Sequence, residues 1–372
     1  MNETIVSYLS NLVNIEFSPL FVFLIFVVAI LIIVNVMALV GGLGTYAERK
    51  ISADIQMRQG PNRVGPYGLL QFLADGVKMI MKEDIIPTES NKFLYTIAPV
   101  LCLSGILATF TVLPFSSGFI LSDLNIGIFY LLGVSSLVGV GIFLGGYSSN
   151  SKWSMLGGMR GASQIISYEV PVTLSILSIV ILAGGLSFKT LVSGQTGFPN
   201  GWYIFHNPFT FIAFFVYFIS ALAEANRAPF DLPEAESELV SGYHTEYSGM
   251  RFAFFALAEY MEVFVLCGVA SALFLGGYKV PFDLGGDTII GQFLQIGSFF
   301  TKTLALYYVV IWVRWTLPRL RVDQLMTVCW KYLTPIAIFN LIGTAVWVWA
   351  FNGKSILSLI LSIGSSAAAG GH

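Results

Sequence analysis

Eight long apolar stretches dominate this sequence and limit what it can fold into. A helix that crosses a bilayer needs about 20 apolar residues, and the chain has eight stretches of roughly this length if a polar residue or a short end is allowed. They are residues 19–43, 94–113, 126–146, 164–186, 208–225, 251–276, 297–316 and 334–351. Only 11% of the 372 residues are charged, against about 25% in a typical soluble protein. We therefore predict an all-α polytopic membrane protein, with eight transmembrane helices in a single membrane domain over 1–372.

The two ends of the chain also carry apolar segments. The first 18 residues hold Glu3 and Glu16 and no Lys or Arg, and the apolar run behind them is longer than the about 7–15 residues of a signal-peptide core. We interpret that run as a retained first span. The run from Ile356 to Ile363 is too short to cross a bilayer, and we expect it at the surface or against a neighbour.

The distribution of Lys and Arg over the connecting segments predicts the orientation. With the N-terminus placed outside, fifteen of the 19 basic residues fall in the inner connections. The other four are Lys189, Lys279, Lys302 and Lys354. Basic residues are enriched on the cytoplasmic side of membrane proteins, so we predict that both termini face away from the cytoplasm. The net charge of −2 gives no reason to expect nucleic-acid binding.

The first inner connection, residues 45–93, contains an amphipathic pattern. Leu69, Leu73, Val77 and Ile80 repeat there at helical spacing. The polar residues that repeat on another face are Gln71, Asp75, Lys78 and Lys82. This pattern predicts a helix over about 67–83 that lies along the cytoplasmic interface. Packing against a soluble partner is the alternative.

The second inner connection, residues 147–163, is rich in glycine. Gly157, Gly158 and Gly161 lie there without the lysine and the preceding strand of a phosphate-binding loop. We therefore expect a tight turn into the fourth span.

The last inner connection is basic, and it carries Arg314, Arg319 and Arg321. These arginines either anchor the topology or clamp an acidic neighbouring subunit.

The cysteines stand far apart, which supports neither a disulfide framework nor a zinc or iron–sulfur site, and a redox thiol is the alternative to buried structural cysteine. No histidine lies inside a predicted span, which argues against haem held between spans. The cysteines are Cys102, Cys267 and Cys329.

Acidic residues inside the predicted spans point to proton transfer. Glu169 lies two residues before Pro171, which locally opens the helix. Glu259 and Glu262 lie three residues apart on one helix face. An isolated charge near the middle of a bilayer costs at least about 3 kcal/mol, so we expect these carboxyls to face a hydrated interior. The fourth span also has a line of polar residues on one face, which we call the polar seam. It is either part of a proton path or a polar contact that joins helices. It consists of Gln164, Tyr168, Pro171, Ser175 and Ser178.

The stretch 224–247 is the most acidic part of the chain. Asp231 and Glu234 resemble a helix start, with a capping carboxylate and a glutamate three residues later. Capping does not explain Glu224, Glu238 or Glu246. Carboxylates gathered in a low-dielectric site exchange protons near neutral pH, and an arginine beside them offsets part of their repulsion. The charged residues of this stretch are Glu224, Arg227, Asp231, Glu234, Glu236, Glu238 and Glu246.

Three separate motifs make the whole chain resemble a known family. They are the stretch from Glu224 to Tyr243, the segment 48–71 with its Gly60-Pro61-Asn62 turn, and residues 164–169. All three resemble the H subunit, also called subunit 1, of respiratory complex I. Details at 51–53, 230–236, 243–249 and 314–321 look most like the cyanobacterial and plastid branch, which reduces plastoquinone in thylakoid membranes with electrons from ferredoxin.

The resemblance implies roles for these segments. In this family eight spans have outward termini, and the amphipathic helix with the first and sixth spans frames the entrance of a quinone tunnel. The loop over 224–250 forms part of the tunnel wall and responds to quinone reduction. The resemblance implies proton-relay roles for Glu169, Glu224 and Glu259, and coupling roles for the loop acids Asp231, Glu234, Glu236, Glu238 and Glu246. To the tunnel and its entrance we assign Arg49, Arg58, Arg63, Arg227 and Phe230.

The resulting expectation is the quinone-tunnel and coupling subunit of a proton-pumping NAD(P)H or ferredoxin:plastoquinone oxidoreductase. This chain would hold no redox centre or metal of its own, and the terminal iron–sulfur cluster would belong to partner subunits of the membrane and peripheral arms. The termini would lie on the lumenal side of a thylakoid membrane, and the acidic loop would lie on the cytoplasmic side. The alternatives are the quinone-independent anchor of a membrane-bound hydrogenase and a free-standing cation or proton transporter.

Overall fold

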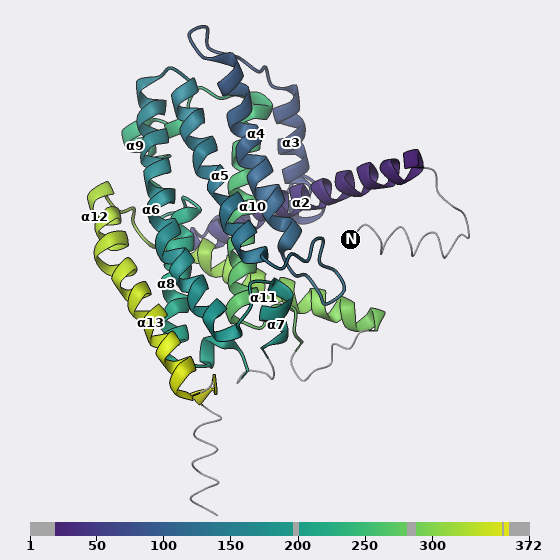
Figure 1. Cartoon of the computed structure of the whole chain (residues 1–372). Helices are drawn as coiled ribbons and strands as arrows, with labels where there is room; N and C mark the ends of the chain where they lie inside the picture. Colours follow the sequence, from purple (N-terminus) through teal and green to yellow (C-terminus); the bar gives the residue numbers. More distant parts are fainter. Residues whose placement is uncertain (1–18, 196–200, 281–287, 352, 357–372) are drawn as a thin grey trace, which may run out of the picture.

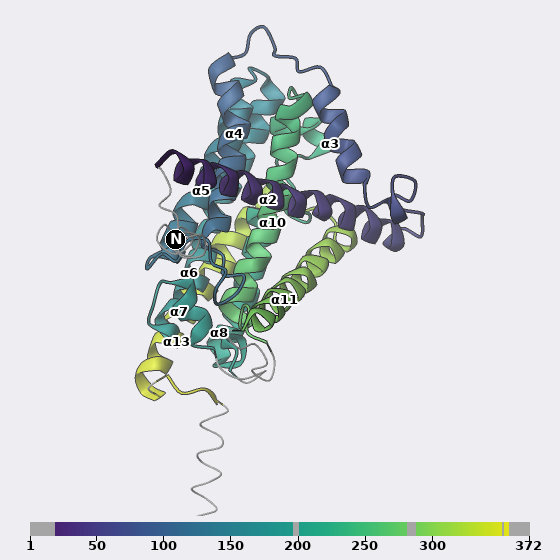
Figure 2. The same ribbon diagram turned by 90° about the vertical axis from the view of Figure 1, so that its right-hand side faces the viewer.

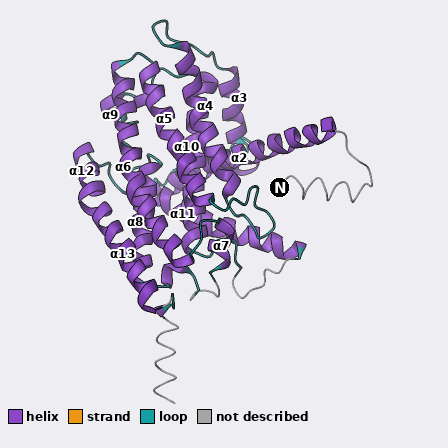
Figure 3. Cartoon of the chain, in the orientation of Figure 1, coloured by secondary structure: helices purple, strands orange, loops and turns teal. Residues whose placement is uncertain are grey.

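The computed structural model describes residues 19–195, 201–280, 288–351 and 353–356 of the chain (Figure 1). Within these ranges all regular structure is helical, as the colouring of Figure 3 shows. The predicted surface run Ile356–Ile363 lies almost entirely outside the described residues. Six segments are long and apolar enough to cross a membrane, namely Lys92–Val112, Gly127–Ser148, Lys152–Ala183, Gly249–Phe274, Ile289–Thr316 and Val322–Phe351.

These six segments coincide with six of the predicted spans. The first predicted span lies within α2 (Pro19–Ile55), a helix of 37 residues, and the fifth coincides with α8 (Pro208–Glu224), an apolar helix of 17 residues. The integral membrane class is therefore supported, and the count of eight spans stays a prediction. The bounds of α4 (Lys92–Thr109), α5 (Gly127–Ser148) and α10 (Gly249–Phe274) differ from the predicted ranges by only a few residues.

The predicted tight turn over 147–163 is wrong, because α6 (Lys152–Ala183) begins inside it. A Cβ atom built at Gly146 of α5 would lie 2.9 Å from the Cα atom of Gly158. The glycines therefore let α5 and α6 approach closely, as small residues do between membrane helices. They serve helix packing and do not form a turn.

The last two spans are also longer than predicted. Helix α11 (Ile289–Thr316) begins eight residues before the predicted start at 297. The predicted loop before the last span is mostly helical. There α12 (Val322–Thr327) runs through the π-helical turn η6 (Val328–Leu333) into α13 (Thr334–Phe351).

The predicted amphipathic helix is present but shorter. Helix α3 (Gln71–Met81) follows the single turn η1 (Pro66–Gly68), and none of its residues is buried within this chain. Its apolar residues Leu73, Val77 and Ile80 are all more than half exposed. An exposed apolar face of this kind suits a bilayer interface or a partner subunit.

Two helices organise the interior. Helix α10 packs against α2, α4 and α11, and α6 packs against α5, α8 and α13. Figure 2 shows α2 and α11 crossing the bundle at steep angles, with α3 near the upper end of α10. From Met261 to Phe274 every residue of α10 is buried. The remaining short helices are α7 (Phe188–Ser193), η2 (Phe110–Val112), η3 (Tyr203–Phe205), α9 (Glu236–Leu239) and η4 (Gly242–His244).

Candidate functional site

The loop that joins α8 to α10 carries the acidic stretch and lies against the first turns of α6. It contains the short helices α9 (Glu236–Leu239) and η4 (Gly242–His244). A Cβ atom built at Gly157 of α6 would lie 2.7 Å from the backbone nitrogen of Tyr243, and one at Gly161 would lie 3.2 Å from Pro233. Glycine at these positions therefore leaves room for the loop to rest on the helix backbone.

Arg227 lies at the centre of a buried group of charges, which we call the Arg227 cluster: Glu48, Arg227, Glu259, Tyr260 and Arg314. Arg227 Nη1 lies 3.5 Å from Glu48 Oε2, and Arg227 Nε lies 3.4 Å from Glu259 Oε1. Arg314 Nη1 lies 2.7 Å from the other oxygen of Glu48. The Arg227 guanidinium also lies 4.3 Å from the centre of the Tyr260 ring. The cluster therefore joins α2, α10 and α11 to the loop.

The charges around Arg227 keep it ionised. Its side chain is only 3% exposed. Burial acts to lower the pKa of Arg227, but the carboxylates of Glu259 and Glu48 outweigh burial and hold the pKa above its usual value. A buried charge of this kind is tolerated when paired, and it is strongly destabilising when a partner is removed.

A second group of acids lies on the membrane helices α6, α8 and α10, and we call Glu169, Glu224, Glu259 and Glu262 the membrane acids. Glu224 ends α8 and is 3% exposed, Glu262 is 7% exposed, and Glu169 is partly buried on α6. Glu224 interacts electrostatically with Glu169, and Glu262 interacts with both Glu224 and Glu259. The membrane acids therefore form a series that meets the Arg227 cluster at Glu259.

The acids of the loop are paired differently from the prediction. Helix α9 begins after Ala235 and has no side-chain cap, so the predicted capping roles of Asp231 and Glu234 are wrong. Asp231 Oδ2 instead accepts a hydrogen bond from Arg319 Nη2 at 3.1 Å. Glu234 Oε1 lies 3.5 Å from His244 Nδ1. Pro233, between these two acids, packs on α6, where a Cβ atom at Gly161 would lie 3.2 Å from it.

Three further loop acids differ in their surroundings. Glu238 Oε2 accepts a hydrogen bond of 2.6 Å from Arg160 Nη1. The Glu246 side chain is exposed, and its backbone carbonyl accepts a hydrogen bond from the Tyr95 hydroxyl at 2.7 Å. The side chain of Glu236 lies outside the described part of the structure. Of the described coupling acids, Asp231 and Glu234 interact electrostatically with each other, whereas Glu238 and Glu246 are exposed.

Burial shifts the titration of two groups in the loop. Burial raises the pKa of Glu234 well above its usual value, and the charges of Glu259 and Asp231 act in the same direction. Burial lowers the pKa of His244 to about 4. At neutral pH the imidazole is therefore uncharged, and a neutral Glu234 is favoured beside it.

The predicted entrance residues fall into an exposed and a buried set. Arg49 donates a hydrogen bond to Asp75 of α3, and both Arg58 and Arg63 are exposed. Burial acts to raise the pKa of Asp75, but Arg49 and Lys78 outweigh it and lower the pKa. These contacts fix α3 to the end of α2 and hold the Asp75 carboxylate ionised.

Phe230 belongs to the buried set together with Arg227. Its ring lies 5.7 Å from that of Tyr168, and its backbone carbonyl accepts a hydrogen bond from Gln164 at 2.7 Å. The Tyr168 hydroxyl donates to the carbonyl of Leu325 at 2.9 Å. The first residues of the polar seam therefore fasten the loop and α12 to α6, which is the structural alternative to a proton path.

Sequence reasoning gave no role to Glu48 and Arg314 in this site. Both belong to segments singled out for other reasons, the motif 48–71 and the basic connection after α11. The connection 45–93 holds five other acidic residues, so the sequence offered no signal that singled out Glu48. Its partners are Arg227 and Arg314. Both lie far from Glu48 in the sequence, so local patterns do not predict these ion pairs.

Known proteins are similar to this chain over most of its length. The profile of the family described as NADH dehydrogenase matches residues 27–345. The chain belongs to the NADH dehydrogenase family. This agrees with the family resemblance of the three motifs, and the buried charges lie within the matched range.

Relatives in this family cover most of the chain. The H subunit of NADH-quinone oxidoreductase from Chlorobaculum tepidum is 49% identical over 82% of this chain and 87% of its own length. The H subunit from Anaeromyxobacter dehalogenans is 46% identical over 85% of this chain and 80% of its own length. Subunit 8 of NADH-quinone oxidoreductase from Rhodothermus marinus is 46% identical, over 86% of this chain and 96% of its own length. The names of these bacterial relatives do not specify the cyanobacterial and plastid branch.

Proposed function

We propose that this chain is the quinone-tunnel and proton-coupling subunit of a type I NAD(P)H or ferredoxin:quinone oxidoreductase. The observation that carries the proposal is the series of buried charges from the loop into the membrane helices. It starts at Glu234, passes through the Arg227 cluster and ends at Glu169. The names of the relatives, which are H subunits of NADH-quinone oxidoreductase, support the same assembly.

In this proposal the loop responds to the reduction of the quinone. Quinone and quinol are both neutral, and reduction takes up two electrons and two protons. When these protons come from groups of the loop, the loop is left with additional negative charge. Glu234 and His244 lie 3.5 Å apart on this loop, and Glu234 interacts electrostatically with Glu259. A change at the loop therefore acts on the ion pair between Arg227 and Glu259, and through it on the membrane acids.

The membrane acids would then pass protons. Glu224 and Glu262 are buried, and a buried carboxyl close to others exchanges its proton readily when a neighbouring charge changes. Glu169 on α6 would be the last member of the series. Following the family resemblance of the motifs, we assign the terminal iron–sulfur cluster to partner subunits.

The finer assignment is also a proposal. Motif details favour plastoquinone as the substrate, ferredoxin as the donor to the assembled complex, and a thylakoid membrane with lumenal termini. Measuring which quinone and which donor the purified complex uses tests this assignment. Use of NADH with a non-plastid quinone would remove it and leave the subunit assignment intact.

The direct test replaces Glu224 and Glu169 by glutamine in the assembled enzyme. We expect each variant to pump fewer protons per electron, because glutamine keeps the shape of the side chain and cannot carry a proton. A matched control is Glu89→Gln, an exposed acid outside the site, which should leave pumping unchanged.

Unaltered pumping per electron in both Glu224→Gln and Glu169→Gln would contradict the relay. A complex that evolves hydrogen and does not reduce quinone would favour the hydrogenase anchor. Ion exchange by the purified chain alone would favour a free-standing transporter.

A further inference from the structure

Helix α3 lies beside the bundle without a buried face of its own. None of its residues is buried within this chain, although the helix contacts α2 and α10 (Figure 2). Most helices in proteins are stabilised by packing an apolar face against the rest of the fold. Since α3 buries no such face in this chain, the contacts around its two ends decide where it lies.

The first turns of α3 are fixed to α2. Asp75 pairs with Arg49 of α2, and a Cβ atom built at Gly42 of α2 would lie 2.6 Å from the Phe72 ring. Glycine at position 42 therefore lets this ring approach the backbone of α2. Neither contact reaches the end of α3 at Met81, so the last turn depends on other contacts.

The chain that leaves α3 lies against the last residues of the loop between α8 and α10, and we call the contacts between 82–85 and 248–251 the α3 junction. The backbone nitrogen of Ile85 donates a hydrogen bond to Ser248 Oγ at 3.1 Å. The same hydroxyl donates to the backbone carbonyl of Glu83 at 3.1 Å. One serine side chain therefore bonds twice to the chain that follows α3.

The charged contact of the α3 junction joins Arg251 to Asp84. Arg251 lies in the first turn of α10, its side chain is 18% exposed, and its Nε lies 3.4 Å from Asp84 Oδ2. A positive charge in the first turn of a helix is disfavoured by the helix dipole, so an arginine at this place needs a nearby carboxylate. Asp84 provides the one ion pair found for Arg251 among the residues that the structure describes. The pair therefore ties the end of α3 to the start of α10.

Two stacked tyrosines restrict the position of Arg251. The rings of Tyr95 and Tyr247 have centres 4.0 Å apart and are nearly parallel, and Tyr95 is completely buried. The Tyr247 hydroxyl donates to the backbone carbonyl of Tyr95 at 3.3 Å. The Arg251 guanidinium lies 5.4 Å from the centre of the Tyr95 ring, a distance at which a cation is attracted to an aromatic face. Arg251 is therefore held by α4 as well as by Asp84.

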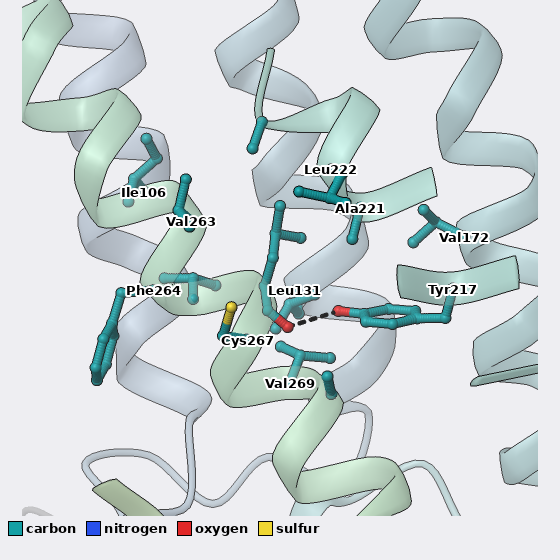
Figure 4. Packing of buried hydrophobic residues seen from close by; sticks show 14 of the residues in the cluster. Ile106, Leu131, Val172, Tyr217, Ala221, Leu222, Val263, Phe264, Cys267 and Val269 are labelled. Atoms are coloured by element: carbon teal, nitrogen blue, oxygen red, sulfur yellow. Dashed lines mark hydrogen bonds between the residues drawn. The ribbon is translucent and has the colours of Figure 1, made fainter. Parts of the chain in front are cut away.

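Helix α10 gives Arg251 a rigid support. Figure 4 shows Val263, Phe264 and Cys267 of α10 packed among apolar side chains of the interior. Tyr217 of α8 donates a hydrogen bond to the carbonyl of Leu266 at 3.0 Å, which the dashed line in Figure 4 marks. Close packing of this kind resists displacement of the helix. The α3 junction therefore fixes the weakly packed α3 by reference to the tightly packed α10.

From this arrangement we infer that Arg251 is a positioning residue for the entrance of quinone, because through Asp84 it sets where α3 lies. The inference rests on the proposed function, in which α3 frames that entrance. It adds two residues that have no part in the series of buried acids. Arg251 and Asp84 act through α3 alone, and they keep the end of this helix at a fixed distance from α10.

A positioning role of this kind affects access and leaves the reaction itself unchanged. Loss of the ion pair frees the last turn of α3, so that a quinone in the bilayer meets a less defined entrance. A higher quinone concentration is then needed for the half-maximal rate. The KM for quinone should therefore rise, whereas kcat and the number of protons pumped per electron should not change.

The experiment uses the assembled enzyme in membrane vesicles and measures KM and kcat for a long-tailed quinone. Asp84→Asn and Arg251→Gln each remove one charge of the pair, and Arg251→Lys keeps the positive charge. Glu89→Gln is the matched control, since Glu89 is an exposed acid in the same connection. We expect KM to rise about two- to fivefold in Asp84→Asn and in Arg251→Gln, the range for loss of a partly exposed ion pair. Arg251→Lys and Glu89→Gln should keep the KM of wild type.

Two further readouts separate this role from a general loss of structure. Amide hydrogen exchange of residues 71–81 should accelerate in Asp84→Asn, while that of residues 92–109 in α4 stays unchanged. Electron transfer from the donor to a water-soluble acceptor such as hexacyanoferrate should keep its wild-type rate, because that acceptor does not use the entrance. A general loss of structure would accelerate exchange in both helices and lower this rate.

Each outcome decides the inference. An unchanged KM in both Asp84→Asn and Arg251→Gln would overturn the positioning role. The same rise of KM in Glu89→Gln, or a fall in kcat at unchanged KM, would overturn it as well. If Arg251→Gln fails to assemble, Asp84→Asn decides alone, since the Asp84 side chain is 38% exposed and its replacement leaves Arg251 in place.

The proposed function stands or falls on other variants. Loss of pumping in Glu224→Gln together with an unchanged KM in Asp84→Asn would remove the role of Arg251 and leave the proposed function standing. Normal pumping per electron in both Glu224→Gln and Glu169→Gln would remove the proton relay, whatever the KM of the junction variants.

Discussion

The acids of the loop and the acids of the membrane helices are compensated in different ways. Asp231, Glu234 and Glu238 each face a basic or titratable partner, namely Arg319, His244 and Arg160. Of the four membrane acids, only Glu259 has an ion pair among the described residues, and that partner is Arg227 from the loop.

This difference distinguishes acids that hold the structure in place from acids that exchange protons. A carboxylate paired with an arginine, such as Asp231 or Glu238, keeps its charge and fixes the chain around it, whereas Glu234 faces an uncharged His244. An unpaired buried carboxyl changes its protonation when a neighbour changes. Arg227 is the residue that joins the two regions, so changes near it should have the largest consequences.

The largest effect is expected from Arg227→Met, which keeps the length of the side chain and removes its charge. It would leave Glu259 buried without a partner, and breaking a buried pair in this way costs about 3–5 kcal/mol. We expect a large fall in the thermal inactivation temperature of the assembled enzyme.

The matched control is Arg160→Met, which breaks the more exposed pair with Glu238. Exposed pairs contribute about 0–1 kcal/mol, so this variant should be near wild type. Equal losses in the two variants would show that burial does not distinguish the Arg227 cluster from the loop surface.

A smaller effect is expected from Gly242→Ala in the loop. Gly242 has φ +61°, and a Cβ atom there would lie 1.7 Å from the carbonyl oxygen of Pro233. The left-handed conformation alone costs an alanine about 1–2 kcal/mol, and the clash forces residue 242 and Pro233 apart within the loop. Hydrogen exchange of residues 230–248 in the assembled enzyme should accelerate.

Gly76→Ala is the control for this change, since a Cβ atom at Gly76 of α3 meets nothing within 4 Å. Replacing glycine by alanine inside a helix stabilises by about 0.5–1 kcal/mol. Unchanged hydrogen exchange in Gly242→Ala would mean that the loop is held by its ion pairs alone.

Hydropathy predicted the helices well because a helix that crosses a bilayer requires a long run of apolar residues. The bounds of α4 and α5 follow from such runs alone. The start of α6 could not be predicted in this way, since Gly157 and Gly161 indicate a turn by local rules. Their contacts with Tyr243 and Pro233 come from a loop that lies about 80 positions later in the chain.

The sequence predicted several acidic residues of the site but not their ion-pair partners. Glu169, Glu224 and Glu259 stand out as acids in apolar runs. Local rules gave Asp231 a capping role, and its observed partner is Arg319, from the far side of α11 in sequence. The partners of Glu48 lie at 227 and 314. Such contacts depend on how the helices are placed, which periodicity does not report.

The smallest expected effect concerns the pH dependence of the loop at His244. Because the folded loop lowers the pKa of His244 from 6.5 to about 4, the unfolded loop binds a proton first as the pH falls through this range. Stability from His244 is therefore fully present above pH 6.5 and is lost as the pH falls toward 4. Between pH 7 and pH 6 the loss should be about 1 kcal/mol or less.

Glu234 contributes with the opposite sign, because its raised pKa makes the folded loop bind the proton more tightly. The contribution of His244 is therefore isolated by comparing wild type with His244→Gln, which keeps Glu234. The inactivation temperature should fall more between pH 7 and pH 6 in wild type than in the variant. The same fall in wild type and in His244→Gln would show that a group other than His244 causes the pH dependence of the inactivation temperature.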